Sequence, residues 1–281
     1  MTHDRYAEEL GILVESVDAE RSRVRVPFRE GNSNPGGALH GGVAASVIDV
    51  AAALVGRAGA GDRPALEHAV VDLSVAYLAA AVNEDVRGEA RVLRRGKELC
   101  FIEVDVRTDG GKGIARGLVT HRSGAPGGEG RELLRDPDSG LTPSATLPGF
   151  VRFFTAAPFM ARLGIRGLRA EDGGAVAALP WSEAHTDAAG ALHGGAVAAL
   201  IDTTGAMASW SLVPLDPRNK ASTPALHVTH HSPARGEEIV ADAITLRRTD
   251  ELFANQVTVR GAMSGRLIAT GTVLYRIVVP G

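Results

Sequence analysis

The chain has 281 residues, of which 44% are apolar and 22% charged, and its formal net charge at pH 7 is -3. This length favours two domains of ordinary size, and the near-neutral charge disfavours nucleic acid or an acidic membrane surface as a partner. The start of the chain, MTHDRYAEEL, has no basic segment followed by an apolar one, and no apolar run approaches the roughly eighteen residues of a membrane span, so we expect a cytoplasmic protein.

The chain runs through the same order of elements twice. A helical segment comes first (RYAEELGI, then FMARLGI), and a strand follows it (RVRVPF, then GAVAALPW). A glycine-rich loop and the pentapeptide ALHGG then lead into a long alanine-rich run, 41–58 and 194–210, which is apolar on nearly all sides and predicts a buried helix. Four segments of strand character complete each copy: 70–78, 86–96, 99–108 and 114–122, and then 225–232, 238–249, 252–261 and 267–279.

A shift of 153 residues aligns the copies and places His40 on His193 and Asp49 on Asp202. Such a repeat indicates a duplicated domain. The segment 123–148 is rich in Gly, Pro and Ser and predicts a linker, so we expect domains at 1–122 and 149–281. A central helix followed by four strands at hairpin spacing predicts an α+β fold, in which an antiparallel sheet wraps around the buried helix of each copy.

Three features of each copy together resemble a known family. They are the His-Gly-Gly opening of the buried helix, the Asp nine positions after the His, and a following strand such as VVDLSVAYL. In these features the chain resembles the hotdog-fold acyl-CoA thioesterases of the phenylacetate-degradation type. The resemblance implies two tandem hotdog domains that form an internal pseudo-dimer, further assembly into a homo-oligomer, and hydrolysis of an acyl-CoA, with no cofactor beyond the coenzyme A of the substrate.

The start of each buried helix can support that chemistry. Gly41 and Gly42, like Gly194 and Gly195, lack a Cβ, so a ligand can approach N–H groups that have no partner within the helix. Together with the helix dipole, these groups would polarise a thioester carbonyl. The alternative that the sequence leaves open is that the glycines let the helix pass close to another element.

Asp49 and Asp202 lie in the middle of the apolar helices, where a carboxylate is costly unless it is paired or faces a pocket. We interpret them as a general base or nucleophile toward the acyl group, with a structural role as the alternative. Gly42 and Asp49 are separated by about 10 Å along a helix, too far to act on one carbonyl. Each Asp is therefore expected to act with the helix start of the other copy.

The two composite sites are predicted to differ. The resemblance implies an Asn six positions before the His and a hydroxyl side chain near the Asp. Asn34 and Thr223 match these positions, whereas the other site has Asp187 and Val70. We expect the first site to carry most of the turnover; it consists of Asn34, His40, Gly41 and Gly42 with Asp202 and Thr223. The second site consists of Asp187, His193, Gly194 and Gly195 with Asp49.

Two facing carboxylates in that second site, Asp187 and Asp49, would leave one of them protonated and inactive. His40 and His193 point to the helical face opposite the Asp, so we expect them to orient the loop by bonding its backbone. Four arginines at hairpin ends suit the phosphates of coenzyme A, with solvated hairpin charges as an equal alternative. They are Arg94, Arg95, Arg247 and Arg248.

We expect no metal. His227, His230 and His231 do not all share one face of a strand, no carboxylate or thiol stands at ligand spacing, and the single cysteine, Cys100, can form no thiol motif. Two rival functions stay open. A hotdog hydratase or dehydratase would need a His facing the reacting carbons with a carboxylate partner, and a non-catalytic acyl-CoA binder would not need the Asp. The acyl group and the choice between general-base and anhydride routes are not readable from the sequence.

Overall fold

The computed structural model describes residues 4–60, 68–123, 148–216 and 218–279. Each copy contributes one long helix, α2 (Gly41–Ala58) and α5 (Gly194–Trp210), with the bounds expected from the sequence. The shorter helices are α1 (Arg5–Leu10), α3 (Gly149–Thr155) and α4 (Pro158–Leu163), and two 3-10 turns are η1 (Glu30–Asn32) and η3 (Glu183–His185).

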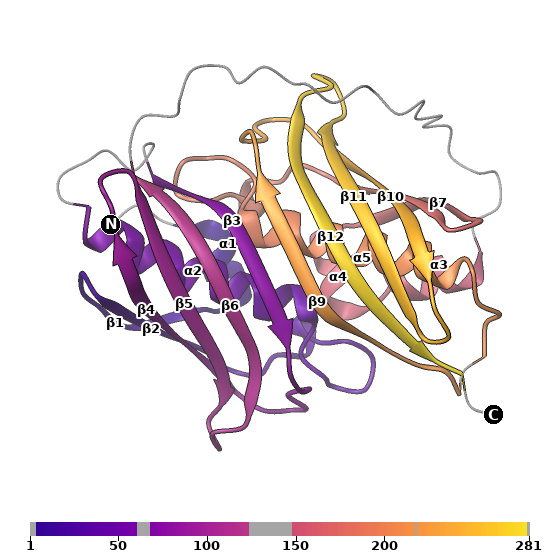
Figure 1. Ribbon diagram of the computed structural model, residues 1–281, viewed down its shortest axis with the longest axis horizontal. Helices are drawn as coiled ribbons and strands as arrows, with labels where there is room; N and C mark the ends of the chain where they lie inside the picture. Colours follow the sequence, from indigo (N-terminus) through magenta and orange to yellow (C-terminus); the bar gives the residue numbers. More distant parts are fainter. Residues whose placement is uncertain (1–3, 61–67, 124–147, 217, 280–281) are drawn as a thin grey trace.

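The strands form one antiparallel sheet that runs through both copies (Figure 1). Its order is β1-β2-β4-β5-β6-β3-β9-β12-β11-β10-β8-β7. The strands of the first copy are β1 (Leu13–Val17), β2 (Arg21–Val26), β3 (His68–Tyr77), β4 (Val86–Arg95), β5 (Leu99–Thr108) and β6 (Gly113–Ser123). Those of the second copy are β7 (Arg166–Glu171), β8 (Gly174–Leu179), β9 (Lys220–His230), β10 (Ile239–Arg248), β11 (Leu252–Gly261) and β12 (Leu267–Val278).

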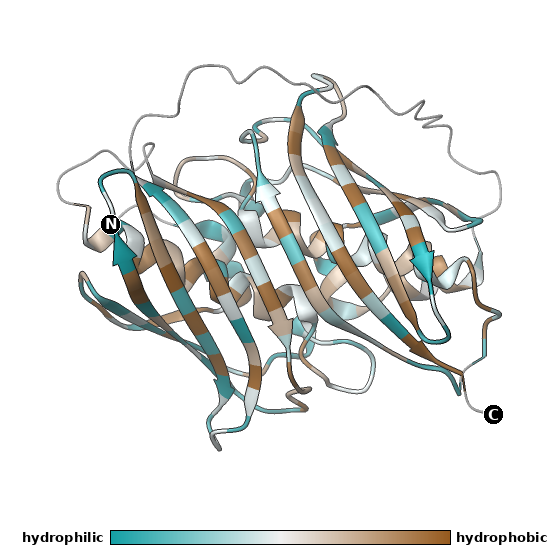
Figure 2. Cartoon of the chain, viewed as in Figure 1, coloured by the Kyte–Doolittle hydropathy of each residue, from teal (hydrophilic) through white to brown (hydrophobic). Residues whose placement is uncertain are grey.

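Helices α2 and α5 lie against the same side of this sheet, behind the strands in the view of Figure 1. The strands alternate hydrophobic and hydrophilic residues, as Figure 2 shows, and their apolar side packs on the helices. In β5, for example, Cys100, Ile102, Val104 and Val106 are buried and the residues between them are more exposed. The expected α+β fold, two tandem hotdog domains each wrapped around a buried helix, is confirmed.

The two copies are related by a pseudo-two-fold axis at the β3–β9 pair. Ser74 of β3 pairs with His227 of β9, and these two residues occupy equivalent positions in the repeat. The two-fold rotation exchanges the flanking pairs: Asp72 pairs with Thr229, and their equivalents Ala225 and Ala76 pair with each other. The internal pseudo-dimer is therefore one continuous sheet whose central ladder joins the copies.

The same symmetry brings the amino-terminal halves of α2 and α5 together. A Cβ built on Gly42 would lie 2.7 Å from Cβ of Ala199, and one built on Gly195 would lie 2.8 Å from Cβ of Ser46. Real Cβ atoms do not approach so closely, so only glycine fits at either position. The second glycine of each HGG motif thus allows close helix packing.

Some elements differ from the sequence-based expectation. β1, β7 and α3 were not predicted, and every residue of β1 is exposed, so its sequence LVESV has no alternation to reveal a strand. β6 ends at Ser123 and α3 begins at Gly149. The predicted linker, 123–148, therefore lies outside the described residues apart from its two end positions, and the domain boundaries stay a prediction.

We expected no run that is long and apolar enough to span a membrane, and this expectation was wrong, because one helix has the required length and composition. Helix α2 passes that test, with a mean hydropathy of 1.4 over its 18 residues. In the folded chain, however, 72% of this segment is buried. It packs on the sheet and on α5, so its apolar surface is already covered by protein.

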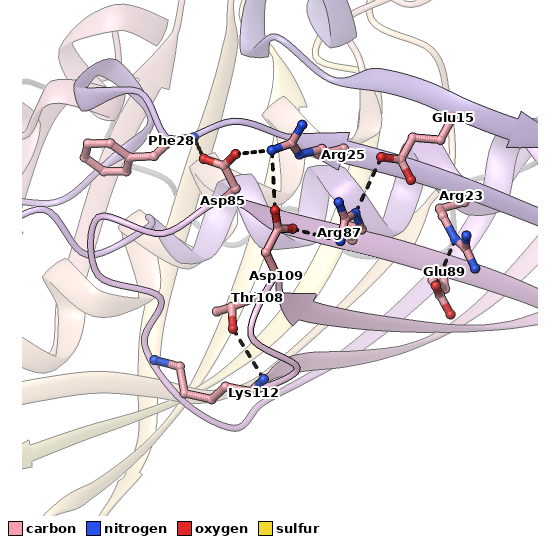
Figure 3. A network of polar contacts seen from close by, with 10 residues as sticks. All are labelled: Glu15, Arg23, Arg25, Phe28, Asp85, Arg87, Glu89, Thr108, Asp109 and Lys112. Carbon is pink, nitrogen blue, oxygen red and sulfur yellow. Dashed lines mark hydrogen bonds and ion pairs between the residues drawn. The ribbon is translucent and has the colours of Figure 1, made fainter.

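A network of charged side chains covers the edge of the sheet in the first copy (Figure 3). Arg25 pairs with Asp85 at 2.7 Å and with Asp109 at 3.4 Å, and Arg87 pairs with Asp109 at 3.1 Å and with Glu15 at 3.5 Å. These side chains are about a third exposed, so each pair contributes at most about 1 kcal/mol. The network joins the edge strand β1 to β2 and β4, with Asp85 just before β4 and Asp109 just after β5.

Candidate active site

Each long helix begins at a histidine cap. His40 Nδ1 accepts a 2.9 Å hydrogen bond from the Gly42 N–H, and His193 Nδ1 accepts an equal bond from the Gly195 N–H. Both histidines thus bond the backbone at the helix start, as an orienting role requires. A contribution of either ring to substrate binding stays a prediction.

The cap leaves one N–H free at each helix start. Within the described parts of the chain, neither the Gly41 N–H nor the Gly194 N–H has a hydrogen-bond partner. Gly42 and Gly195 cannot act as carbonyl donors while they serve the histidine caps. The expected pair of donors is therefore reduced to a single N–H at each site, aided by the helix dipole.

Asp202 of α5 lies at the start of α2. Its Oδ2 is 3.3 Å from the position that a Cβ on Gly41 would take, and its Oδ1 accepts a 2.7 Å hydrogen bond from Thr223 of β9. Burial raises the pKa of this carboxyl to about 6, and the Thr223 hydroxyl partly opposes the rise. A carboxylate with such a pKa is ionised at neutral pH and still basic enough to take a proton.

Tyr77, at the end of β3, completes this group. Its hydroxyl donates a 3.1 Å hydrogen bond to the Gly41 carbonyl, and its Cε1 is 3.4 Å from a Cβ built on Gly41. Burial and then the charge of Asp202 raise the pKa of the phenol well above its ordinary value, so it remains a donor. We call Gly41, Tyr77, Asp202 and Thr223, with the His40 cap, site 1.

Asn34 lies in the loop before site 1. Its N–H donates to the Ala38 carbonyl at 2.8 Å, and its carbonyl accepts from the Gly37 N–H at 3.2 Å. Its side chain is half-buried. The equivalent Asp187 instead directs Oδ1 at its own loop, where it accepts from the N–H groups of Ala189 and Ala191 at 2.8 and 3.0 Å.

Asp49 of α2 lies at the start of α5 in the corresponding way. A Cβ built on Gly194 would lie 2.6 Å from Asp49 Oδ2 and 3.2 Å from His230 Nε2. His230, the last residue of β9, occupies the position that Tyr77 has in the first copy. We call Gly194, His230 and Asp49, with the His193 cap, site 2.

The cap of site 2 also differs in charge. His193 Nε2 lies 3.3 Å from Asp4 Oδ2, and its Nδ1 lies 3.4 Å from Asp49 Oδ2. Burial lowers the pKa of His193, but Asp4 and Asp49 outweigh it and raise the pKa to about 9. The bond that Nδ1 accepts from the Gly195 N–H requires the neutral ring, so protonation of Nδ1 exchanges that bond for one donated toward Asp49. No such carboxylate acts on His40 within the part of the chain that the structure describes, and burial lowers its pKa to about 4.

An aromatic side chain from the other copy covers each histidine cap. The ring centroid of Phe159 lies 4.8 Å from that of His40, and Tyr6 lies at the same distance from His193. Tyr6 also bonds Ser46 Oγ at 3.0 Å. Helix α1 therefore packs on the site 2 loop, and α4 packs on the site 1 loop.

The predicted coenzyme A arginines lie at the other ends of the long helices. Arg95 donates to the carbonyls of Gly56, Val55 and Ala19, and Arg248 donates to that of Leu212. Gly56 is about 22 Å from Gly41 along α2. Arg94 and Arg247 are the chain neighbours of these residues and are also exposed in part. None of the four arginines lies at a helix start, and their phosphate contacts stay a prediction.

The three clustered histidines, two in β9 and His231 just after it, have different partners. His227 Nε2 is 2.7 Å from Asp72 Oδ2, and His231 Nε2 is 2.9 Å from Thr270 Oγ1, while His230 belongs to site 2. Among the described residues, no group of three or more His, Cys, Asp or Glu side chains could hold a metal ion.

The sequence interpretation missed Tyr77, His230 and Asp4 as site residues. The alignment of the copies contained a signal, because it places Tyr77 on His230, two different polar side chains at the end of equivalent strands. Their approach to the glycines depends on the β3–β9 register, which the strand pattern alone does not fix.

Comparisons with known proteins show the family to which the chain belongs. The model of the thioesterase superfamily matches residues 36–115 and again 189–274. Acyl-coenzyme A thioesterase 13 of Mus musculus is 36% identical over 123 residues, which are 43% of this chain and 84% of the mouse protein. The Homo sapiens protein of the same name is 36% identical over 90 residues, 32% of this chain and 62% of that protein.

Among solved structures, a Novosphingobium aromaticivorans protein gives a TM-score of 0.68 at 18% identity, covering 96% of this chain and 98% of its own. A hot dog fold protein of Alicyclobacillus acidocaldarius gives 0.61 at 16% identity over the whole of both chains. These likenesses concern the fold along the full double-domain chain. Because the family model matches both copies, including both helix starts and both central aspartates, the chain belongs to the thioesterase superfamily.

Proposed function

We propose that the chain hydrolyses acyl-CoA thioesters to a free acid and coenzyme A, as the phenylacetate-degradation type of hotdog thioesterase does. The observation that carries the proposal is the position of Asp202 of one copy at the helix start of the other. Its Oδ2 lies 3.3 Å from the Cβ position on Gly41, whose N–H has no partner among the described residues. The similarity to acyl-coenzyme A thioesterase 13 supports the acyl-CoA substrate.

In site 1 the Gly41 N–H would bind the thioester carbonyl and stabilise the negative charge that develops on its oxygen. Asp202 would take a proton from the attacking water, or attack the carbonyl itself. Thr223 holds the carboxylate in place, and Asn34 would position water or substrate. Breakage of the C–S bond then releases coenzyme A, which takes up the proton.

We infer that site 1 carries most of the turnover because its Asp202 accepts a hydrogen bond from the Thr223 hydroxyl, whereas Val70 stands at the equivalent position of the other copy. The proposal further includes a cytoplasmic homo-oligomer with no nucleic-acid or membrane partner and no cofactor apart from the coenzyme A of the substrate. The burial of α2 within the fold supports the expectation that this helix does not serve a membrane.

A thiol-release assay against aliphatic and aromatic acyl-CoAs tests the proposal. We expect hydrolysis of at least one acyl class, a loss of about 100-fold or more in kcat/KM for Asp202→Asn, and a smaller loss for Asp49→Asn. Equal losses would contradict the asymmetry. Tight binding of acyl-CoA with no thiol release from the wild type would favour the non-catalytic binder.

Oxygen-18 labelling separates the two routes. A single turnover in labelled water leaves label in the Asp202 carboxyl only if an anhydride forms and water attacks its enzyme carbonyl. Label found only in the released acid is expected from the general-base route and also from an anhydride that water attacks at its acyl carbonyl, so label in Asp202 is the result that identifies the anhydride.

The hydratase or dehydratase remains a second candidate because of one observation. His230 and Asp49 flank Gly194 in site 2, which is the His and carboxylate pair that such an enzyme would need. Enoyl-CoA and 3-hydroxyacyl-CoA therefore belong in the substrate panel. Interconversion of these two without thiol release would favour this candidate.

A further inference from the structure

Site 2 contains a buried basic group with no partner. Within the described residues, Nε2 of His230 is buried and accepts or donates no hydrogen bond. It lies 3.2 Å from the position of a Cβ on Gly194, the residue whose N–H is also unpaired. An unpaired buried nitrogen beside an unpaired helix N–H marks a place where a polar ligand can bind to both.

Site 2 is therefore more than a degenerate copy of site 1. Its Asp49 lacks a hydroxyl partner, since Val70 stands where the other copy has Thr223, but it gains His230 where the other copy has Tyr77. A tyrosine with a raised pKa cannot take a proton from water at neutral pH, whereas a neutral imidazole can. The two sites thus hold different bases beside the same kind of helix start.

We propose that site 2 is a second hydrolytic site for acyl thioesters, in which His230 acts as the general base and the Gly194 N–H binds the carbonyl. The proposal rests on the thioesterase activity proposed above for the chain. It differs from the proposal for site 1 in its base, and it requires the chain to have two active centres with different pH dependence.

The step balances without any further reactant. His230 Nε2 removes a proton from water as the water oxygen attacks the thioester carbon, and the Gly194 N–H stabilises the oxyanion. The tetrahedral intermediate collapses, the C–S bond breaks, and the proton passes from the imidazolium to the leaving thiolate. Asp49, within reach of the same point, stabilises the imidazolium by its charge.

The groups around His230 keep it in the basic form. Burial lowers the pKa of His230 below its ordinary value. Asp49 on α2 and Asp72 on β3 oppose that shift, and His193 at the start of α5 and His231 beyond β9 add to it. At neutral pH the imidazole is therefore uncharged.

The test isolates site 2 in the full chain. The double variant Asp202→Asn with Thr223→Val removes the site 1 base and gives that position the valine that the first copy already has. We expect this variant to retain measurable thiol release from acyl-CoA, with an acid limb in kcat/KM below pH 6.5. Adding His230→Gln should lower the remaining rate by about 100-fold at pH 8.

Two controls protect the interpretation. His230→Tyr, which installs the residue of the equivalent position, should give the same loss as His230→Gln, and thermal unfolding of each variant checks that the fold persists. In the otherwise wild-type chain, His230→Gln should lower the total rate much less, because site 1 continues to work.

The outcomes separate this proposal from the general one. A wild-type chain without thioesterase activity overturns the proposed function itself. An active wild type whose double variant is silent, or whose remaining rate is unaffected by His230→Gln, overturns only the second centre. Conversion of enoyl-CoA by the double variant without thiol release would also overturn it in favour of hydration.

Discussion

Thr223 donates a 2.7 Å hydrogen bond to Asp202, and the equivalent position in the first copy is Val70, which can donate none. The two copies share a fold and a helix start, yet only one central carboxylate is oriented by a hydroxyl. Since burial raises the pKa of Asp202 to about 6 and this bond partly opposes the rise, Thr223 sets how basic the carboxylate is. The pH dependence of the enzyme should therefore respond to Thr223.

Replacing Thr223 by Val should move the acid limb of kcat/KM upward. Loss of the hydrogen bond removes stabilisation of the charged form, so the pKa of Asp202 rises further, by about one unit. The measurement is kcat/KM from pH 5 to pH 9 with one acyl-CoA. Thr223→Ser keeps the hydroxyl and should leave the limb near pH 6. An unmoved limb in the valine variant would show that Asp202 is not the group that titrates.

Asp202→Asn should make the protein more stable while it reduces activity. The pKa of Asp202 rises on folding from 3.8 to about 6, so the folded state holds the proton more tightly than the unfolded state. The penalty for ionising the buried group is absent below pH 3.8, grows between pH 3.8 and 6, and is complete above that range. The free energy of unfolding of the variant should exceed that of the wild type by about 2 to 3 kcal/mol at pH 7.5 and by much less at pH 4.

Urea unfolding at both pH values measures this difference. A constant difference across pH would mean that it comes from packing rather than from the charge. A variant less stable than the wild type at pH 7.5 would contradict the prediction, because it would mean that the ionised carboxylate stabilises the fold.

Gly41→Ala should reduce activity, whereas Gly42→Ala should reduce stability. A Cβ on Gly41 would lie 3.3 Å from Asp202 Oδ2, in the space proposed for the carbonyl, so kcat/KM should fall with little change in melting temperature. A Cβ on Gly42 would lie 2.7 Å from Cβ of Ala199, so the helices must separate, at a cost of about 1 to 3 kcal/mol.

Steady-state kinetics and thermal unfolding of both variants check this division. Gly195→Ala is the matched control for helix packing, because a Cβ there meets Ser46 in the same way. A large loss of stability in Gly41→Ala with an unchanged rate in the folded fraction would contradict the assignment.

The sequence predicted the parts of the site that local patterns determine. The bounds of α2 and α5 followed from the apolar runs that begin at the His-Gly-Gly motifs. The rise per residue required Asp202 to serve the helix start of the other copy. The hydrogen bond from Thr223 was reached only through the family resemblance. These features depend on spacing within one helix or on a match to one motif.

Other features depend on how distant segments meet. His230 and Tyr77 reach the glycines because β3 pairs with β9 around Ser74 and His227, a register that no single strand encodes. The sequence suggested that Arg95 could bind a phosphate, but its guanidinium donates to backbone carbonyls at the end of α2. Neither contact leaves a periodic signal in the sequence.

Asp4→Asn should lower the pKa of His193. Asp4 Oδ1 accepts the Ala7 N–H at the start of α1, and its Oδ2 lies 3.3 Å from His193 Nε2. Asn preserves the helix cap and removes the charge. Burial lowers the pKa of His193, and in the variant only the charge of Asp49 remains from the pair that opposes this effect. The pKa of His193 should therefore fall from about 9.

NMR titration of the imidazole protons, with His193→Gln to assign the resonance, measures the shift. His40, whose cap has no carboxylate and whose pKa is about 4, is the internal control and should not move. The stabilising effect of the Asp4–His193 pair is complete below the unfolded pKa of 6.5 and is lost as the pH rises through 9. The variant should therefore be less stable than the wild type at pH 6, and the difference should shrink toward pH 9.5. An unchanged titration midpoint would mean that Asp4 does not contribute to the raised pKa of His193 and that Asp49 alone raises it.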